Sequence, residues 1–208
     1  MTLEQLLAFA QFAYVSSATP GPNNVLLTAV GGAVGVRRGL PVLWGIAIGF
    51  AAMLFILGLG IGETLFSIPY VKEGMRIAGF AVLAWLAWQI ATAPVARETP
   101  ADEKDEAPDT GRRGSFLGAA LFQWMNPKAW MIAGVAISTY MSPDLDVIRQ
   151  ATTFAVVFVA AAAAGCLPWL AFGAVMRVKL RDPRIARPFN ILMAVLLIVS
   201  MLLVAFDT

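Results

Sequence analysis

Long apolar stretches dominate this chain, and six of them are long enough to cross a lipid bilayer. A helix needs about 20 apolar residues for one crossing. Lipid offers no hydrogen-bond partner to the backbone, and none of these stretches alternates apolar and polar residues as a membrane-spanning strand does. The pattern therefore predicts an all-α, polytopic membrane protein with six transmembrane helices, over residues 3–34, 40–63, 71–93, 115–141, 148–176 and 188–206.

One hydrophilic stretch, residues 94–114, separates the first three predicted helices from the last three. It is rich in Pro, Glu, Asp and Arg, and such a composition cannot bury enough apolar surface to fold. We expect a flexible linker here. It divides one transmembrane domain into a first three-helix repeat at 1–93 and a second three-helix repeat at 115–208.

Proline interrupts the first and the fourth predicted helices near their middles. The first contains Pro20 and Pro22, and the fourth contains Pro127. Proline lacks a backbone N–H and clashes with the preceding turn, so it breaks a helix. Pro22 and Pro127 lie 105 residues apart, which indicates a tandem repeat. Because each unit has three helices, the second must insert upside down. The sequence predicts two inverted three-helix repeats with helices 1 and 4 broken, a pattern that marks transporter binding sites; the alternative is a pair of kinks without function.

The residues around the two breaks are the candidate substrate-binding residues. The free N–H groups of the half-helix that starts at Asn23 and Asn24 would face an anionic group such as a carboxylate. Lys128 lies inside the fourth span, where a charge costs at least about 2.5–3.5 kcal/mol. It needs a polar cavity, a cluster of carbonyls or an anionic substrate; the alternative is that it reaches a lipid headgroup. The full candidate set is Thr19, Pro20, Gly21, Pro22, Asn23, Asn24, Asn126, Pro127 and Lys128.

Composition removes most enzymatic functions. The chain is 59% hydrophobic and 13% charged, with no histidine and one cysteine, Cys166, which we expect to be a packing residue. The chain therefore lacks the residues needed for a histidine base, a Cys–His pair or a His- or Cys-rich metal site. We expect no catalytic residue, metal, other cofactor or nucleic-acid partner. The absence of acidic residues from the middles of the spans weakens an alternative, an exporter of inorganic cations. A further alternative is an intramembrane enzyme that pairs Ser16 or Ser17 with Lys128.

Lys and Arg are distributed unevenly between alternate loops, and this bias sets the orientation of a membrane protein. Lys72, Arg76 and Arg149 lie on one side. The loop after the first span, the linker and the segment between the fifth and sixth spans hold Arg37, Arg38, Arg97, Lys104, Arg112, Arg113, Arg177, Lys179, Arg181, Arg184 and Arg187. We therefore expect the linker in the cytoplasm and both termini outside.

Small residues recur in the second predicted span. Gly45/Gly49 and Gly58/Gly62 form two GxxxG pairs, and such pairs allow helices to approach closely. We expect them to pack within the chain, with the seam of a homodimer as the alternative.

Two motifs lie at the two breaks: Ser17-Ala18-Thr19-Pro20-Gly21-Pro22-Asn23-Asn24 and Gln123-Trp124-Met125-Asn126-Pro127-Lys128-Ala129-Trp130. They resemble the motifs of a known family, the lysine exporter and homoserine/threonine exporter (LysE/RhtB) family. The resemblance covers nearly the whole chain. It implies secondary-active export of an amino acid or an amino-acid derivative across the bacterial inner membrane, with the proton as the expected coupling ion and the candidate set above as the site. It does not fix the substrate.

Overall fold

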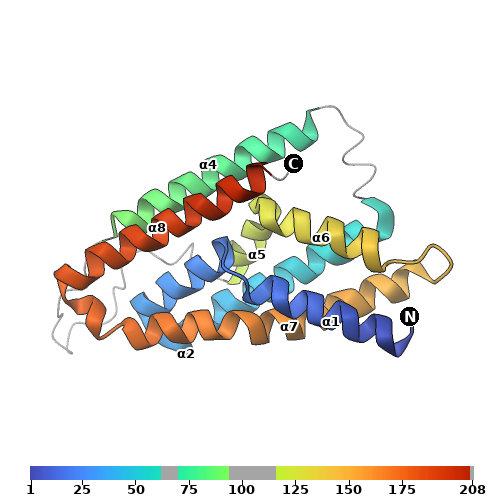
Figure 1. The fold of residues 1–208 in the computed structure, drawn as a ribbon, viewed down its shortest axis with the longest axis horizontal. Helices are drawn as coiled ribbons and strands as arrows, with labels where there is room; N and C mark the ends of the chain where they lie inside the picture. The colour runs from blue at the N-terminus through green and yellow to red at the C-terminus, as the bar shows by residue number, and fades with distance from the viewer. Residues whose placement is uncertain (62–69, 94–115, 207–208) are drawn as a thin grey trace.

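The predicted all-α class is confirmed. The computed structural model describes residues 1–61, 70–93 and 116–206, so the predicted linker at 94–114 lies outside the described residues. Every regular element in these ranges is helical (Figure 1). The elements are α1 (Leu3–Ala18), α2 (Pro22–Ile56), the π-helical turn η1 (Leu57–Ile61), α4 (Val71–Ala91), α5 (Phe116–Met125), α6 (Pro127–Tyr140), α7 (Val147–Met176), the 3-10 turn η2 (Lys179–Arg181) and α8 (Pro183–Phe206).

Helix α2 folds back on itself at Gly35. This residue has φ 81° and ψ 176°, a conformation open to glycine because it has no Cβ. The limb before Gly35 and the limb after it lie side by side, since a Cβ on Gly39 would sit 3.2 Å from the side chain of Val30. The loop implied between the predicted spans 3–34 and 40–63 is therefore wrong, because one glycine makes the turn.

Helix α7 packs against both limbs of α2. A Cβ on Gly173 would overlap the carbonyl oxygen of Thr28, and a Cβ on Gly45 would overlap that of Phe116 in α5. Glycine at these positions lets the helix backbones approach closely. Gly45 and Gly49 both face α5, so the predicted packing within the chain is confirmed for this pair. Gly62 of the second pair lies outside the described residues.

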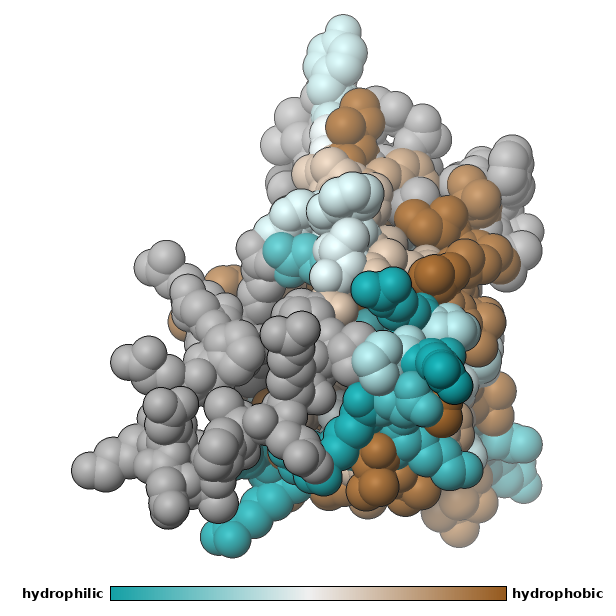
Figure 2. All heavy atoms as spheres, turned by 90° about the vertical axis from the view of Figure 1, so that its left-hand side faces the viewer, coloured by the Kyte–Doolittle hydropathy of each residue, from teal (hydrophilic) through white to brown (hydrophobic). Residues whose placement is uncertain are grey.

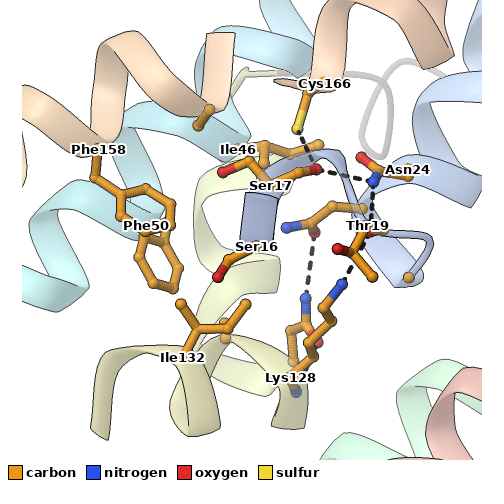
Figure 3. Close-up of a pocket in the computed structure, with 15 residues that line it drawn as sticks. Ser16, Ser17, Thr19, Asn24, Ile46, Phe50, Lys128, Ile132, Phe158 and Cys166 are labelled. Atoms are coloured by element: carbon orange, nitrogen blue, oxygen red, sulfur yellow. Dashed lines mark hydrogen bonds between the residues drawn. The ribbon is translucent and has the colours of Figure 1, made fainter. Parts of the chain in front are cut away.

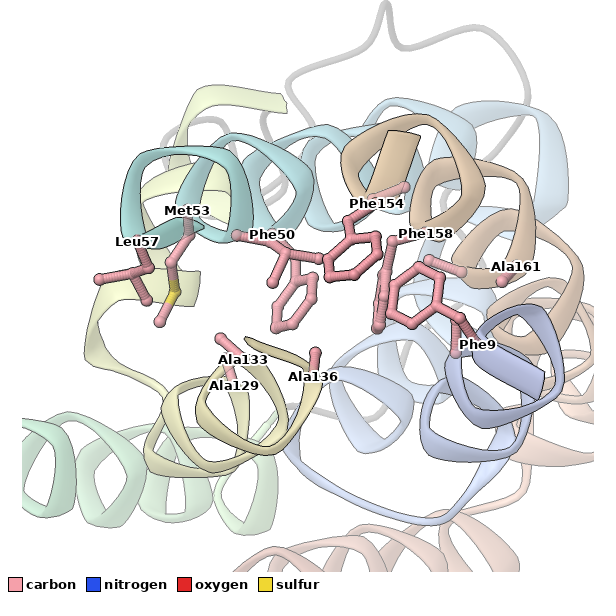
Figure 4. Close-up of a cluster of buried hydrophobic side chains, with 14 residues drawn as sticks. Phe9, Phe50, Met53, Leu57, Ala129, Ala133, Ala136, Phe154, Phe158 and Ala161 are labelled. Carbon is pink, nitrogen blue, oxygen red and sulfur yellow. The ribbon is translucent and has the colours of Figure 1, made fainter. Parts of the chain in front are cut away.

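One cluster of buried apolar side chains joins α1, α2, α6 and α7 (Figure 4). Phe9 of α1 stacks on Phe154 of α7 with ring centroids 4.3 Å apart, and Phe50 of α2 meets Phe158 of α7 at 4.2 Å. Stacked aromatic pairs stabilise a core beyond the area they bury. Helix α6 contributes small residues, such as Ala133, that let it lie close to these rings. The cluster holds the two broken helices against α7.

Helices α4 and α8 form a second layer, side by side over α5 and α6 (Figure 1). Leu83 of α4 and Leu197 of α8 are fully buried in a shared apolar cluster. Helix α8 starts at Pro183, five residues before the predicted start at 188. The Asp182 carboxylate accepts a hydrogen bond from the N–H of Arg184 at 2.8 Å, and such a cap starts a helix. The predicted helix started later because the residues of this first turn are basic and do not extend the apolar stretch.

Two of the described helical stretches, Pro22–Gly60 and Val147–Met176, are long and apolar enough to cross a membrane. Large apolar side chains such as Val156, Val175 and Leu192 are more than half exposed on the outer surface. An apolar exterior of this extent fits lipid better than water. The number of spans stays a prediction.

Candidate functional site

Each break has its own local cause. At the first, Thr19 ends α1 in an extended conformation, and α2 begins with Pro22 at its first helical position. At the second, the Asn126 side chain accepts a hydrogen bond from the N–H of Lys128 at 3.1 Å, and α6 begins with Pro127. Proline suits this position because the N–H it lacks has no partner inside the helix. Both breaks occur where the sequence predicts them.

The two breaks meet in space through side-chain amides. Asn23 donates to Gln123 Oε1 at 2.9 Å, and Gln123 Nε2 donates back to Asn23 Oδ1 at 3.1 Å. Asn126 Nδ2 donates to the same Asn23 oxygen at 3.3 Å. Gln123 is fully buried, and buried amides keep such pairing because unpaired polar groups are costly. Gln123 is absent from the predicted set; its place in the second motif, beside a proline break, was the available signal.

Lys128 crosses from the second break to the first. Its ammonium donates to the carbonyl oxygens of Thr19 at 2.9 Å and Pro20 at 3.1 Å. These carbonyls lie at the C-terminal end of α1, where the helix dipole favours a cation. A Cβ on Gly21 would sit 2.9 Å from Lys128 Nζ, so glycine makes room for the lysine. The ammonium thus binds a cluster of backbone carbonyls at the partner break, which is one of the environments that its charge requires.

Asn24 is buried beside Lys128, with 2% of its surface exposed. Its Nδ2 donates to the carbonyl oxygens of Ser17 at 2.9 Å and Thr19 at 2.8 Å. Its Oδ1 is buried and has no hydrogen-bond partner. A buried polar atom without a partner costs about 1–3 kcal/mol. A hydrogen bond donated to this oxygen would remove that cost.

A cavity of about 30 Å³ lies between the breaks (Figure 3). A buried water needs about 10–15 Å³ of such space, so the cavity has room for about two waters. Figure 3 shows Phe50 and Phe158 on one side and Asn24, Thr19 and Lys128 on the other. The lining residues are Ser16, Ser17, Thr19, Gly21, Asn23, Asn24, Ile46, Phe50, Asn126, Lys128, Ala129, Ile132, Phe158, Ala162 and Cys166.

Two helix N-termini and Lys128 bring positive charge to the cavity, and the carbonyls at the C-terminal end of α1 offset part of it. Helices α2 and α6 both begin at the cavity wall, at Gly21 and Asn126, and a helix N-terminus carries about half a positive charge. The Lys128 ammonium adds a full positive charge. No acidic side chain is among the described residues that line the cavity. A buried positive region without an anion favours an anionic ligand group.

The structure sorts the predicted site residues into two groups. Six line the cavity, and Pro20 contributes its carbonyl to Lys128. Pro22 and Pro127 do not line it and instead start α2 and α6. The predicted set omits Ser16 and Ser17, which adjoin the first break, and also Cys166 and the apolar wall from α2, α6 and α7, which distant segments contribute. The six lining residues are Thr19, Gly21, Asn23, Asn24, Asn126 and Lys128.

Ser17 and Lys128, two of the three residues named in the Ser–Lys alternative, are hydrogen-bonded to other groups. The Ser17 hydroxyl donates to the Ala13 carbonyl at 2.7 Å, while the Lys128 ammonium binds the first break. A lysine base has to hydrogen-bond the serine that it activates.

Trp124 and Trp130 meet edge to face at 5.9 Å behind the second break, and neither lines the cavity.

Apolar helices that enclose a small cationic cavity at two paired breaks define a membrane translocator. The chain belongs to the LysE type translocator family, whose model matches residues 14–207. The cysteine/O-acetylserine efflux proteins of Salmonella paratyphi A and Escherichia coli O1:K1 are each 30% identical to it over 199 residues, which is 95% of this chain and 96% of the relative. No solved structure matches the chain significantly. The predicted family and the predicted function, amino-acid export across a membrane, are confirmed.

Proposed function

We propose that the chain is a six-span, secondary-active exporter of a small amino acid in the bacterial inner membrane, and that its substrate binds in the cavity between the two breaks. The observation that carries the proposal is the Lys128 ammonium, which lies beside the cavity and contacts the carbonyls of Thr19 and Pro20. The α-carboxylate of the substrate pairs with this cation and with the positive starts of α2 and α6. The proton gradient drives export, as the family resemblance implies.

The cavity is too small to hold the substrate in this conformation. Space for about two waters does not hold an amino acid. Export therefore requires the walls to separate toward one side of the membrane and then the other. The hydrogen bonds between the breaks are the contacts that such a motion breaks and remakes, because they join side chains from different halves of the chain.

The substrate we propose has an uncharged side chain. Phe50, Phe158, Ile46 and Ile132 form an apolar wall of the cavity, which favours an apolar or weakly polar group. A basic side chain would place a second cation near Lys128 with no acidic residue in the described lining. The relatives named for cysteine and O-acetylserine efflux support this class. Both molecules are small and uncharged beyond their amino-acid groups.

The charge distribution supports the proposed orientation. Exposed basic residues gather at the end where α7 passes into α8, and a Cβ on Gly35 would sit 3.5 Å from Arg177, so the α2 fold-back lies at the same end. Figure 2 shows hydrophilic residues gathered on this end of the molecule. Cytoplasmic segments are enriched in Lys and Arg. We place this end and the linker in the cytoplasm, and the two termini outside.

The two breaks support the proposed inverted repeats. Each break is followed by a proline at the first position of the next half-helix, Pro22 or Pro127. The half-helices that follow meet through Asn23 and Asn126. The inorganic-cation alternative has no such support: among the described residues, no group of three His, Cys, Asp or Glu residues is placed to hold a metal ion.

The test is transport by purified protein in proteoliposomes loaded with labelled L-cysteine or O-acetyl-L-serine. We expect wild-type protein to exchange at least one of them and Lys128→Met to lose about tenfold or more of the rate, because a charge-assisted contact is removed. Lys179→Met, which removes an exposed lysine from η2, is the matched control and should retain the wild-type rate. Wild-type exchange by Lys128→Met would refute this site, and a wild-type protein that exchanges neither amino acid would refute the proposed substrate class.

A further inference from the structure

The carboxamide of Asn24 has a fixed orientation. Its Nδ2 donates to two carbonyl oxygens, those of Ser17 at 2.9 Å and Thr19 at 2.8 Å (Figure 3). Rotation by half a turn would bring Oδ1 against the same two oxygens and lose both hydrogen bonds. The hydrogen-bond network therefore assigns the nitrogen and the oxygen. It leaves Oδ1 as an acceptor.

This acceptor has no donor in the protein. Asn24 lines the cavity and is 2% exposed, and its Oδ1 is unpartnered. Asn23 also lines the cavity, but both of its amide atoms are paired, with Gln123 and Asn126. The Lys128 ammonium already binds two carbonyls. A molecule that binds in the cavity must supply the donor that Asn24 lacks.

The positions of Asn24 and Lys128 are coupled through one atom. Both donate to the carbonyl oxygen of Thr19, Asn24 at 2.8 Å and Lys128 at 2.9 Å. The Asn24 carboxamide and the Lys128 ammonium are thereby neighbours on the cavity wall. An amino acid carries a carboxylate and an ammonium on a single carbon, so this pair matches both of its charged groups.

We propose that Asn24 recognises the α-ammonium group of the exported amino acid through its free carboxamide oxygen, while Lys128 receives the α-carboxylate. The inference rests on the proposed function and extends it, since it explains how the protein rejects carboxylic acids that lack the amine. Selection of this kind is strong when a buried polar group of the site is left unpaired by the wrong ligand.

The experiment compares L-cysteine with 3-mercaptopropionate, which is cysteine without its amine, as competitors for exchange in proteoliposomes under reducing conditions. Wild-type protein should bind cysteine about tenfold or more tightly, because a hydrogen bond to a charged group is lost with the amine. In Asn24→Leu the ratio of the two inhibition constants should fall toward one. Asn190→Leu, the same change on α8 outside the cavity, should keep the wild-type ratio.

A purely structural role for Asn24 predicts a different result. It would weaken both ligands equally and leave their ratio unchanged, which would overturn the proposal. Asn24→Gln retains both the amide donor and the acceptor oxygen and should keep the preference for cysteine; it is the second test if Asn24→Leu does not reach the membrane, and loss of the preference in Asn24→Gln would also count against the proposal. Failure of the proposed function looks different, because wild-type protein would then transport neither cysteine nor O-acetylserine.

Discussion

Asn23 and Gln123 lie 100 residues apart in the sequence and form a reciprocal amide pair, in which each side chain donates one hydrogen bond to the other, at 2.9 and 3.1 Å. Asn23 belongs to the first turn of α2 and Gln123 to the last turn of α5. The pair joins the half-helix after the first break to the half-helix before the second. Asn23 also lines the cavity, so the pair fixes one residue of its wall.

The strength of this pair is accessible to a double-mutant cycle. We expect Gln123→Ala to lower the free energy of unfolding by about 1–3 kcal/mol, because the Asn23 amide then lacks its buried partner. Asn23→Ala should have a similar cost, and the double variant should cost less than the sum, with a coupling of about 0.5–3 kcal/mol. The measurement is unfolding in detergent followed by tryptophan fluorescence. Additive costs would show that the two amides do not support each other.

Gly21→Ala should impair transport without removing the protein from the membrane. A Cβ at this position would lie 2.9 Å from both Cδ and Nζ of Lys128, so the lysine must leave the carbonyls of Thr19 and Pro20. We expect exchange in proteoliposomes to fall severalfold. Gly134→Ala in α6 is the matched control, because its Cβ would meet nothing within 4 Å. Equal exchange rates for the two variants would mean that the position of Lys128 does not limit transport.

Gly173→Ala should act on stability, because the added methyl group would overlap the Thr28 carbonyl where α7 crosses α2. Overpacking of this kind costs about 1–3 kcal/mol, and here it separates two helix backbones. We expect a lower melting temperature in detergent and less protein in the membrane. Gly74→Ala, whose Cβ would meet nothing within 4 Å, should behave as wild type. A Gly173→Ala protein of unchanged stability would show that α7 shifts freely along α2.

The proposed orientation can be tested with single cysteines in a Cys166→Ala background, which removes the one natural thiol. Asp144→Cys, in the exposed loop before α7, should react with a membrane-impermeant maleimide on intact cells. Lys179→Cys, at the basic end, should react only after the membrane is opened. Labelling of Lys179→Cys in intact cells would reverse the proposed orientation.

Part of the site could be located from the sequence because proline acts locally. The missing N–H and the ring clash act on the adjacent turn, and both breaks were predicted from Pro22 and Pro127, although Pro168 lies inside the continuous helix α7. The same holds for Lys128, whose charge inside an apolar stretch demanded a partner. The helical class, both breaks and the family followed from such local features.

Other features depend on segments that meet only after folding. The connection predicted at 35–39 is shorter than expected, because Gly35 alone makes the turn and helix resumes directly after it. The start of α8 was missed because its first turn is charged. The partners of Lys128 are backbone carbonyls more than 100 residues away, and any residue type could supply them. No sequence pattern predicts which carbonyls bind Lys128.

The sequence by itself determined that the chain is helical and apolar, where two of its helices break and which side chains stand at the breaks, because these depend on composition and on neighbours along the chain. The tertiary structure alone decided that Asn23 pairs with Gln123, that Thr19 accepts from both Lys128 and Asn24, and that one oxygen of Asn24 stays free. Those contacts arise where α1 and α2 pack against α5 and α6, which sets distances between residues that the chain order leaves far apart.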